Sequence, residues 1–185
     1  MRIITGRARG LKLKTPAGLS TRPTSDRVKE SLFSVLSGLI NFSEVNTVLD
    51  IFAGTGALGL ESISRGANSA TFIDAATTEI IRDNITRTKF DNCNVLRGDF
   101  EKILLRLAKQ NLTFDLIFSD PPYAKGLAQK SLNLVAELNL LNAGGLIIVE
   151  HGTEEILTSP TFELVRRLTY GNTTRIEIFC KEKAV

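Results

Sequence analysis

From residue 46 onward, the chain alternates short apolar runs with stretches of helical periodicity. Two of these runs, Leu116–Phe118 and Leu146–Val149, are continuously apolar, which is typical of strands covered on both faces of a parallel sheet. This alternation predicts an α/β fold, a sheet between two layers of helices. We expect strands at Thr47–Phe52, Ala70–Asp74, Asn94–Arg97, Phe114–Ser119 and Leu146–Glu150, and helices at Leu58–Arg65, Thr78–Lys89, Glu101–Lys109 and Leu127–Leu140.

The two ends of the chain depart from this alternation. After Pro160, strand-like runs at Phe162–Thr169 and Thr174–Lys181 enclose a Gly-Asn pair, which favours a hairpin and an antiparallel end to the sheet. At the other end, the first 15 residues predict a hairpin of two short strands, followed by a turn-rich linker up to Pro23. A helix then begins near Thr24 or Ser25, either of which can cap it. We therefore divide the chain into an arm, residues 1–23, and a main domain, residues 24–185.

Positive charge is concentrated in the arm and the start of the first helix. Residues 1–29 hold eight basic residues and one acid, a net charge of +7, whereas the rest of the chain carries −4. Such a concentration of charge is typical of a contact surface for a polyanion, and nucleic acid is the obvious candidate.

Other partners and locations are disfavoured by composition. No apolar run approaches the length needed to cross a bilayer, and the first residues lack the apolar stretch of a secretory signal. We therefore expect a cytoplasmic protein with no membrane partner. With one histidine and two distant cysteines, we also expect no metal site.

A glycine-rich loop follows the first strand of the sheet. Gly54, Gly56 and Gly59 match the pattern G-x-G-x-x-G, and Asp74 follows Gly54 by 20 residues, as in dinucleotide-binding proteins. A NAD-dependent oxidoreductase is therefore one interpretation. Against it, Asp50 would place a carboxylate beside a pyrophosphate, and 185 residues leave little room for a second mononucleotide-binding half.

S-adenosylmethionine fits the same loop better, because it carries an ammonium, a ribose and an adenine but no phosphate. Asp50 can bind the ammonium, Asp74 the ribose hydroxyls, and Asp99 the adenine amine, with Phe100 against the ring. These acids follow three successive strands, where ligands of open α/β sheets bind. The expected cofactor-binding residues are Asp50, Phe52, Gly54, Gly56, Asp74, Asp99 and Phe100.

The fourth strand is followed by the segment Asp120-Pro121-Pro122-Tyr123. An exocyclic amine of a nucleobase is a poor nucleophile because its lone pair is delocalised into the ring. If Asp120 and the Pro121 carbonyl accept its two N–H hydrogens, the nitrogen can turn its lone pair toward a methyl donor. The rings of Pro121 and Pro122 stiffen the loop, and Tyr123 can stack on a flipped-out base. All four residues are therefore expected to be catalytic.

The glycine loop together with this tetrapeptide resembles class I, Rossmann-like methyltransferases that modify amino groups of DNA and RNA. The segments Met1–Gly6, Gly10–Leu13 and above all Thr21–Phe33 are similar to the bacterial RsmD family. This resemblance implies a mostly parallel seven-stranded sheet with an antiparallel last strand. It also implies methylation of the N2 amine of a guanine in 16S rRNA of the small ribosomal subunit, free or within an assembling particle.

Guanine is not the only possible target, because adenine-N6 methyltransferases of RNA or DNA share the tetrapeptide. The basic residues of the arm and first helix agree with an RNA substrate. The expected RNA-binding residues are Arg7, Arg9, Lys12, Arg22, Thr24 and Arg27, although Thr24 suits a helix cap at least as well.

Overall fold

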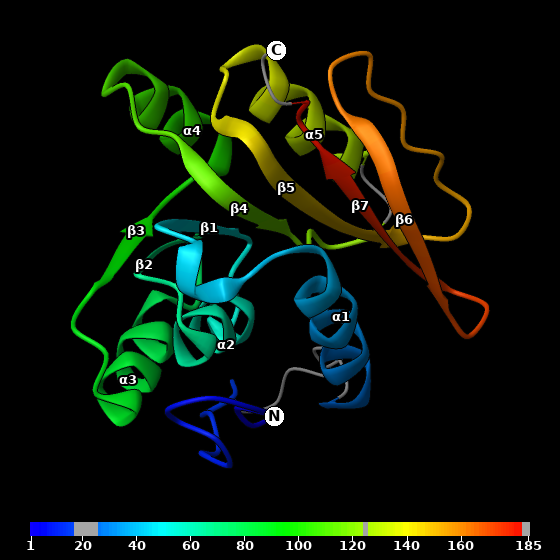
Figure 1. Cartoon of the computed structure of the whole chain (residues 1–185). Helices are drawn as coiled ribbons and strands as arrows, with labels where there is room; N and C mark the ends of the chain where they lie inside the picture. The colour runs from blue at the N-terminus through cyan, green and yellow to red at the C-terminus, as the bar shows by residue number, and fades with distance from the viewer. Residues whose placement is uncertain (17–25, 124–125, 183–185) are drawn as a thin grey trace.

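A single seven-stranded sheet organises the computed structural model, which describes residues 1–16, 26–123 and 126–182 (Figure 1). Its strand order is β3-β2-β1-β4-β5-β7-β6. The elements are α1 (Asp26–Leu39), the 3-10 helix η1 (Phe42–Glu44), β1 (Thr47–Ile51), α2 (Ala57–Arg65), β2 (Ser69–Asp74), α3 (Thr78–Thr88), β3 (Cys93–Arg97), α4 (Phe100–Lys109), β4 (Phe114–Ser119), α5 (Leu127–Glu137), β5 (Leu141–Gly152), β6 (Glu163–Tyr170) and β7 (Thr174–Cys180).

The first five strands pair in parallel, whereas β7 lies antiparallel between β5 and β6. The β6–β7 hairpin predicted from the Gly-Asn pair is present and closes at Tyr170 opposite Thr174. This arrangement is the class I methyltransferase fold, so the predicted fold class is confirmed. In the sheet of dinucleotide-binding dehydrogenases, by contrast, the sixth strand lies next to the fifth.

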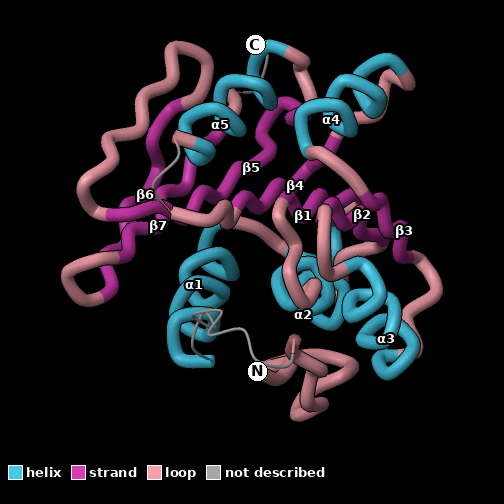
Figure 2. The backbone as a smooth tube through the Cα atoms, turned by 180° about the vertical axis from the view of Figure 1, so that it is seen from behind, coloured by secondary structure: helices cyan, strands magenta, loops and turns pink. Residues whose placement is uncertain are grey.

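Helices cover both faces of the sheet and explain the apolar strand sequences. Helices α1, α2 and α3 lie on one face with the N-terminal arm, and α4 and α5 lie on the other (Figures 1 and 2). Successive strand side chains point to opposite faces. Leu116 and Phe118 of β4 pack in the cluster with α1 and α2, whereas Ile117 packs in the cluster with α4 and α5. Because helices cover both faces of β4, each side chain of Leu116–Phe118 is buried, and the run is continuously apolar.

The boundary between α5 and β5 differs from the prediction. The helix ends at Glu137 rather than Leu140, and the strand begins at Leu141 rather than Leu146. Asn139 has a left-handed backbone, with a φ of 53°, a conformation that asparagine tolerates and that ends a helix. The early start of β5 depends on a shift in its register with β4, between Phe114 and Leu116, which the apolar pattern does not reveal.

The N-terminal arm packs closely on α2, and its predicted hairpin is present as a short antiparallel pairing rather than as two full strands. The N–H groups of Ile3 and Leu13 donate to the carbonyls of Leu11 and Met1, both at 3.0 Å, on either side of a single isolated bridge between Arg2 and Lys12. The arm is also held by contacts with α2, and at Gly6 the approach is so close that an added Cβ would lie 1.8 Å from the Ser64 carbonyl oxygen. The predicted cap of α1 and the proposed arm boundary at residue 23 lie outside the described residues. In the described part of the chain, no helix is long and apolar enough to span a membrane.

Candidate active site

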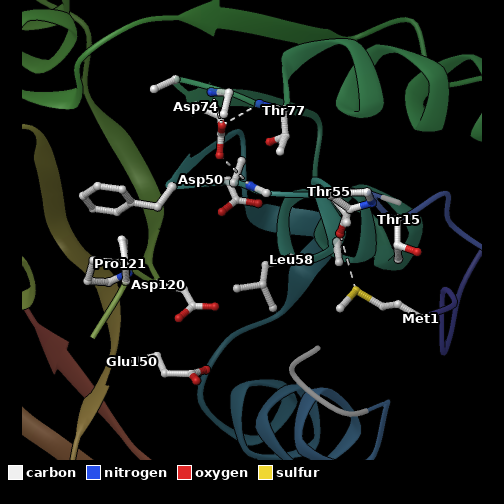
Figure 3. Close-up of a pocket in the computed structure, with 18 of the residues that line it drawn as sticks. Met1, Thr15, Asp50, Thr55, Leu58, Asp74, Thr77, Asp120, Pro121 and Glu150 are labelled. Carbon is white, nitrogen blue, oxygen red and sulfur yellow. Dashed lines mark hydrogen bonds between the residues drawn. The ribbon is translucent and has the colours of Figure 1, made fainter. Parts of the chain in front are cut away.

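A cavity of about 540 Å³ opens at the carboxyl ends of β1, β2, β4 and β5 (Figure 3). This volume is in the range of small-molecule sites. The chain leaves β1 for β2 on one side and later adds β4 on the other, so the cavity lies at the switch point of the sheet, where open α/β folds bind ligands. Asp50, Asp74 and Asp120, predicted from the sequence as functional, come together in its lining.

Each glycine of the loop has its own structural reason. Gly54 has a φ of 58° and lines the cavity, and a Cβ there would meet open space apart from the Phe52 carbonyl oxygen at 3.9 Å. Gly59 lies in α2, and its Cβ would come within 2.4 Å of the Phe72 ring. The first glycine therefore leaves room for a ligand, and the last lets α2 pack closely on β2.

Phe52 is the least expected residue of the loop. It has a left-handed backbone with a φ of 61°, which costs an aromatic residue about 1–3 kcal/mol and is concentrated at functional sites. Its side chain lines the cavity, and its ring lies 4.7 Å from that of Phe100. The strained conformation thus sets an aromatic surface into the cavity wall, in line with its predicted role in cofactor binding.

The Asp74 carboxylate organises the backbone around it. One oxygen accepts hydrogen bonds from the N–H groups of Ala76 and Thr77, both at 2.8 Å, and the other accepts from Gly54 at 2.9 Å. A carboxylate has about four acceptor positions, so these bonds leave place for about one ligand hydroxyl. The predicted binding of both ribose hydroxyls by Asp74 would require one of these backbone bonds to yield.

Asp50 lines the cavity although only 2% of its surface is exposed. One of its oxygens accepts a hydrogen bond from the N–H of Gly59 at 3.0 Å, which joins the end of β1 to α2. Burial raises the pKa of its carboxyl to about 8; the Gly59 hydrogen bond opposes this shift and the charge of Asp74 adds to it. The carboxyl is therefore poised to ionise when a cation approaches.

Three predicted cofactor residues, Gly56, Asp99 and Phe100, are not among the described residues that line the cavity. Gly56 precedes α2, with a φ of 76°. Asp99 is exposed and caps α4, accepting a hydrogen bond from the N–H of Lys102 at 3.1 Å. The contact of these three residues with a cofactor stays a prediction. Phe100 packs against Phe52, which itself lines the cavity.

The segment Asp120–Tyr123 lines the same cavity, as its position after β4 predicts, and Figure 3 shows Asp120 and Pro121 on the side away from Thr55. The Tyr123 hydroxyl donates a hydrogen bond to Glu150 at 2.7 Å, and the Thr174 hydroxyl lies 3.1 Å away, placed to donate to it. Burial raises the pKa of the Tyr123 phenol, so the ring is neutral and anchored at its polar end.

The sequence interpretation missed several residues of this cavity. Glu150 ends the buried part of β5, so it repeats the pattern of acids at strand ends that drew attention to Asp50, Asp74 and Asp120. Met1 also lines the cavity, and its sulfur accepts a hydrogen bond from the Thr55 hydroxyl at 3.5 Å. No sequence signal points to Met1, because its place depends on how the arm folds back.

The predicted RNA-binding residues lie in different surroundings. Arg9, Lys12 and Arg27 are exposed, whereas Arg22 and Thr24 fall outside the described residues. Arg7 contributes to the fold, because its guanidinium donates to the Ile63 carbonyl at 3.2 Å and lies 5.2 Å from the centre of the Phe90 ring. A phosphate contact by Arg7 would have to share that guanidinium.

His151 is not among the described residues that line the cavity, although it follows Glu150 in β5. His151 is buried, its Nδ1 lies 2.9 Å from the Gly152 carbonyl oxygen, and its Nε2 lies 3.8 Å from Glu177. Among the residues that the structure describes, no three histidine, cysteine or acidic side chains are grouped as metal ligands would be.

Comparison with known proteins assigns the chain to a family. The family model described as "Conserved hypothetical protein 95" matches residues 1–179. YlbH of Bacillus subtilis (strain 168) is 37% identical over 178 residues, 94% of this chain and 95% of that protein. Ribosomal RNA small subunit methyltransferase D of Escherichia coli (strain K12) is 38% identical over 156 residues, 83% of this chain and 76% of that protein. The solved structure of yhhF from Escherichia coli has a TM-score of 0.84 at 34% identity, covering 100% of this chain and 99% of that one. The chain belongs to the family described as Conserved hypothetical protein 95.

Proposed function

We propose that this chain transfers a methyl group from S-adenosylmethionine to the exocyclic N2 amine of a guanine in 16S rRNA. The observation that carries the proposal is the position of Asp120–Tyr123, which faces the glycine loop and Asp74 across one cavity. A methyl donor held by the loop and a base held by the tetrapeptide would then meet without any further domain.

The charges that line the cavity favour S-adenosylmethionine over NAD. Asp74, Asp120 and Glu150 contribute carboxylates, Asp50 adds a carboxyl that ionises when a cation approaches, and Lys29 is the only basic residue in the described lining. Lys29 is already paired with Glu61 at 3.2 Å. A cationic ligand such as S-adenosylmethionine is attracted to this cavity, whereas the pyrophosphate of NAD would face carboxylates with little compensation.

The tetrapeptide can make a nucleobase amine reactive. Asp120 and the Pro121 carbonyl accept its two hydrogens, so that the nitrogen lone pair is directed at the donor. S-adenosylmethionine would supply the methyl group from its sulfonium. As the N–C bond forms and the S–C bond breaks, the amine becomes cationic, and the Asp120 carboxylate stabilises this charge before a proton leaves. Holding the partners in line supplies several kcal/mol of the rate enhancement.

The choice of ribosomal RNA rests on the relatives and on charge. The Escherichia coli relative bears the name Ribosomal RNA small subunit methyltransferase D, and a bacterial ribosomal substrate would place this protein in the cytoplasm. The exposed Arg9, Lys12 and Arg27 agree with a polyanionic substrate. An adenine-N6 methyltransferase would use the same tetrapeptide, so the test must identify the modified base.

The test supplies labelled S-adenosylmethionine with unmodified 16S rRNA and, separately, with small-subunit particles, and maps the product by mass spectrometry. We expect N2-methylguanine at a single position. If the product is N6-methyladenine instead, the proposed guanine target is wrong and the enzyme is an adenine-N6 methyltransferase. In a parallel thermal-shift experiment, stabilisation by NAD and none by S-adenosylmethionine would overturn the methyltransferase assignment.

The buried Asp50 predicts that cofactor binding releases a proton. Because its carboxyl has a pKa of about 8 in the free protein, it is mostly protonated at pH 7, and an approaching ammonium favours its ionised form. Affinity for S-adenosylmethionine should therefore rise with pH, by about tenfold between pH 6 and pH 7 for one proton released. Titration calorimetry at both pH values checks this. Asp50→Asn should flatten the dependence, and a flat wild-type profile would contradict the role of Asp50.

The exposed basic residues of the arm predict a salt-dependent contact with RNA. Arg9→Gln with Lys12→Gln should weaken binding and lower the slope of log affinity against log salt by roughly 1.4–1.8, for two lost phosphate contacts. Arg106→Gln with Lys109→Gln removes the same charge from α4, on the opposite face of the sheet. Equal salt slopes for the two double variants, measured by filter binding, would remove the arm from the RNA interface.

A further inference from the structure

Glu150 belongs to the part of the cavity that would hold the target base. Ser119 of β4 pairs with Val149 of β5, so Asp120 and Glu150 occupy equivalent positions, one residue further along adjacent parallel strands. Both side chains line the cavity, and Figure 3 shows both near Leu58, away from Asp74. Two carboxylates are thus presented to the same part of the cavity by neighbouring strands.

The orientation of the Glu150 carboxylate is set by its neighbours. The Tyr123 hydroxyl donates to Oε1 of Glu150 at 2.7 Å, and this hydroxyl lies 3.1 Å from that of Thr174 on β7. Tyr123 is also the aromatic ring expected to stack on the base. This hydrogen bond therefore connects the Tyr123 ring, which would stack on the base, to the Glu150 carboxylate, which would face the edge of the base.

The edge of guanine suits a pair of carboxylates, and the edge of adenine does not. Guanine carries the N1–H donor next to its N2 amine, so N1–H and one hydrogen of the amine point in nearly the same direction. Adenine carries an N1 lone pair next to its N6 amine, which a carboxylate would repel. A site built to hydrogen-bond one group discriminates strongly against an analogue that lacks it, because the site's own polar group is left unpaired.

We infer that Glu150 is the residue that selects guanine, by accepting the N1–H of the base while Asp120 and the Pro121 carbonyl accept the hydrogens of its N2 amine. This inference rests on the proposed function and adds to it a chemical basis for choosing guanine over adenine. The tetrapeptide alone does not make that choice, because its hydrogen-bond acceptors contact only the amine and the Tyr123 ring can stack on either base.

The test replaces the guanine mapped in the methylation assay by 2-aminopurine, introduced into the same RNA by splinted ligation. This base keeps the N2 amine but lacks O6 and has an N1 lone pair in place of N1–H, so the Glu150 variant is needed to assign the effect to N1. The wild-type enzyme should methylate it with a kcat/KM lower by roughly 10- to 150-fold, the value of a hydrogen bond to a charged group. In Glu150→Gln the side-chain amide can donate to that lone pair and still accept from Tyr123.

We therefore expect Glu150→Gln to lose roughly 10- to 150-fold in kcat/KM on guanine and little on 2-aminopurine, so that the ratio between the two bases approaches one. Glu154→Gln, an equal change of charge at an exposed position nearby, should keep both the activity and the ratio. If Glu150 only positioned Tyr123, Glu150→Gln would lower the activity on guanine and on 2-aminopurine by the same factor.

The outcomes separate this inference from the proposed function. An equal loss on both bases in Glu150→Gln, or wild-type activity that does not distinguish the two bases, would overturn the role of Glu150 while leaving guanine methylation intact. No N2-methylguanine with the natural RNA would instead overturn the proposed function. The wild-type comparison of the two bases does not depend on the variant, so equal activity on both bases would overturn the role of Glu150 even if Glu150→Gln folds poorly.

Discussion

Asp120→Ala is expected to lower kcat for methyl transfer by at least about 10²- to 10³-fold, the usual effect of removing one group that stabilises a transition-state charge. The reason is that the side chain both accepts an amine hydrogen and opposes the positive charge that develops on nitrogen. The affinity for S-adenosylmethionine should change little, because Asp74, which is expected to bind its ribose, lies away from Asp120 in the cavity. Single-turnover methylation and equilibrium cofactor binding measure the two quantities separately.

Two further variants sharpen this prediction. Asp120→Asn keeps a carbonyl acceptor and loses the charge, so its activity should lie between that of the wild type and that of Asp120→Ala. Asp91→Ala removes an exposed aspartate just before β3, at the opposite ends of the parallel strands, and should have no effect. Wild-type turnover in Asp120→Ala would contradict the assigned role. A rate in Asp120→Asn as low as in Asp120→Ala would assign the whole effect to charge.

Most of the fold follows from local patterns. Buried strand segments such as Leu116–Phe118 are continuous apolar runs because helices cover both faces, and the glycine loop marks the turn from β1 into α2. The pattern fails where conformation depends on distant contacts. The start of β5 depends on a register shift against β4, and the arm is held by groups such as Glu61, which is 57 residues from Ile4 in sequence.

The site was predictable to the extent that acids follow strands. Asp50, Asp74 and Asp120 could be placed together because parallel strands end at one edge of the sheet. The same argument extends to Glu150, but its connection to Tyr123 depends on a hydrogen bond between β5 and the loop that follows β4. Lys29 could not be recognised as a cavity residue, because its position reflects how α1 packs against α2.

The second large effect concerns Glu61, which connects the arm, α1 and α2. Its side chain is fully buried and accepts hydrogen bonds from the N–H groups of Ile4 at 2.7 Å and Thr5 at 3.0 Å. It also pairs with the fully buried Lys29 at 3.2 Å and with Arg65 at 2.9 Å. Glu61 thus supplies the opposite charge for Lys29 and Arg65 and the hydrogen-bond acceptor for the two N–H groups. Because Glu61 is buried, a water molecule does not readily replace its carboxylate.

Glu61→Ala should therefore lower the free energy of unfolding by about 3–5 kcal/mol, because breaking a buried ion pair leaves the other charge uncompensated. For a chain of this size the melting temperature should fall by roughly 6–20 °C. Glu101→Ala is the matched control. It breaks a pair with Lys130 that is shorter, at 2.6 Å, but exposed, and it should cost less than about 1 kcal/mol. Equal losses in the two variants, measured by urea unfolding, would refute this account of Glu61.

The pH dependence of the loss distinguishes an uncompensated charge from a simple packing defect. Burial lowers the pKa of Lys29, and Glu61 opposes that shift; without Glu61 the pKa of Lys29 should fall further. The unfolded state then binds a proton that the folded state releases, so stability rises with pH below the unfolded pKa of Lys29. The deficit of Glu61→Ala should accordingly shrink between pH 7 and pH 10, whereas a cavity left by the missing side chain would give the same deficit throughout.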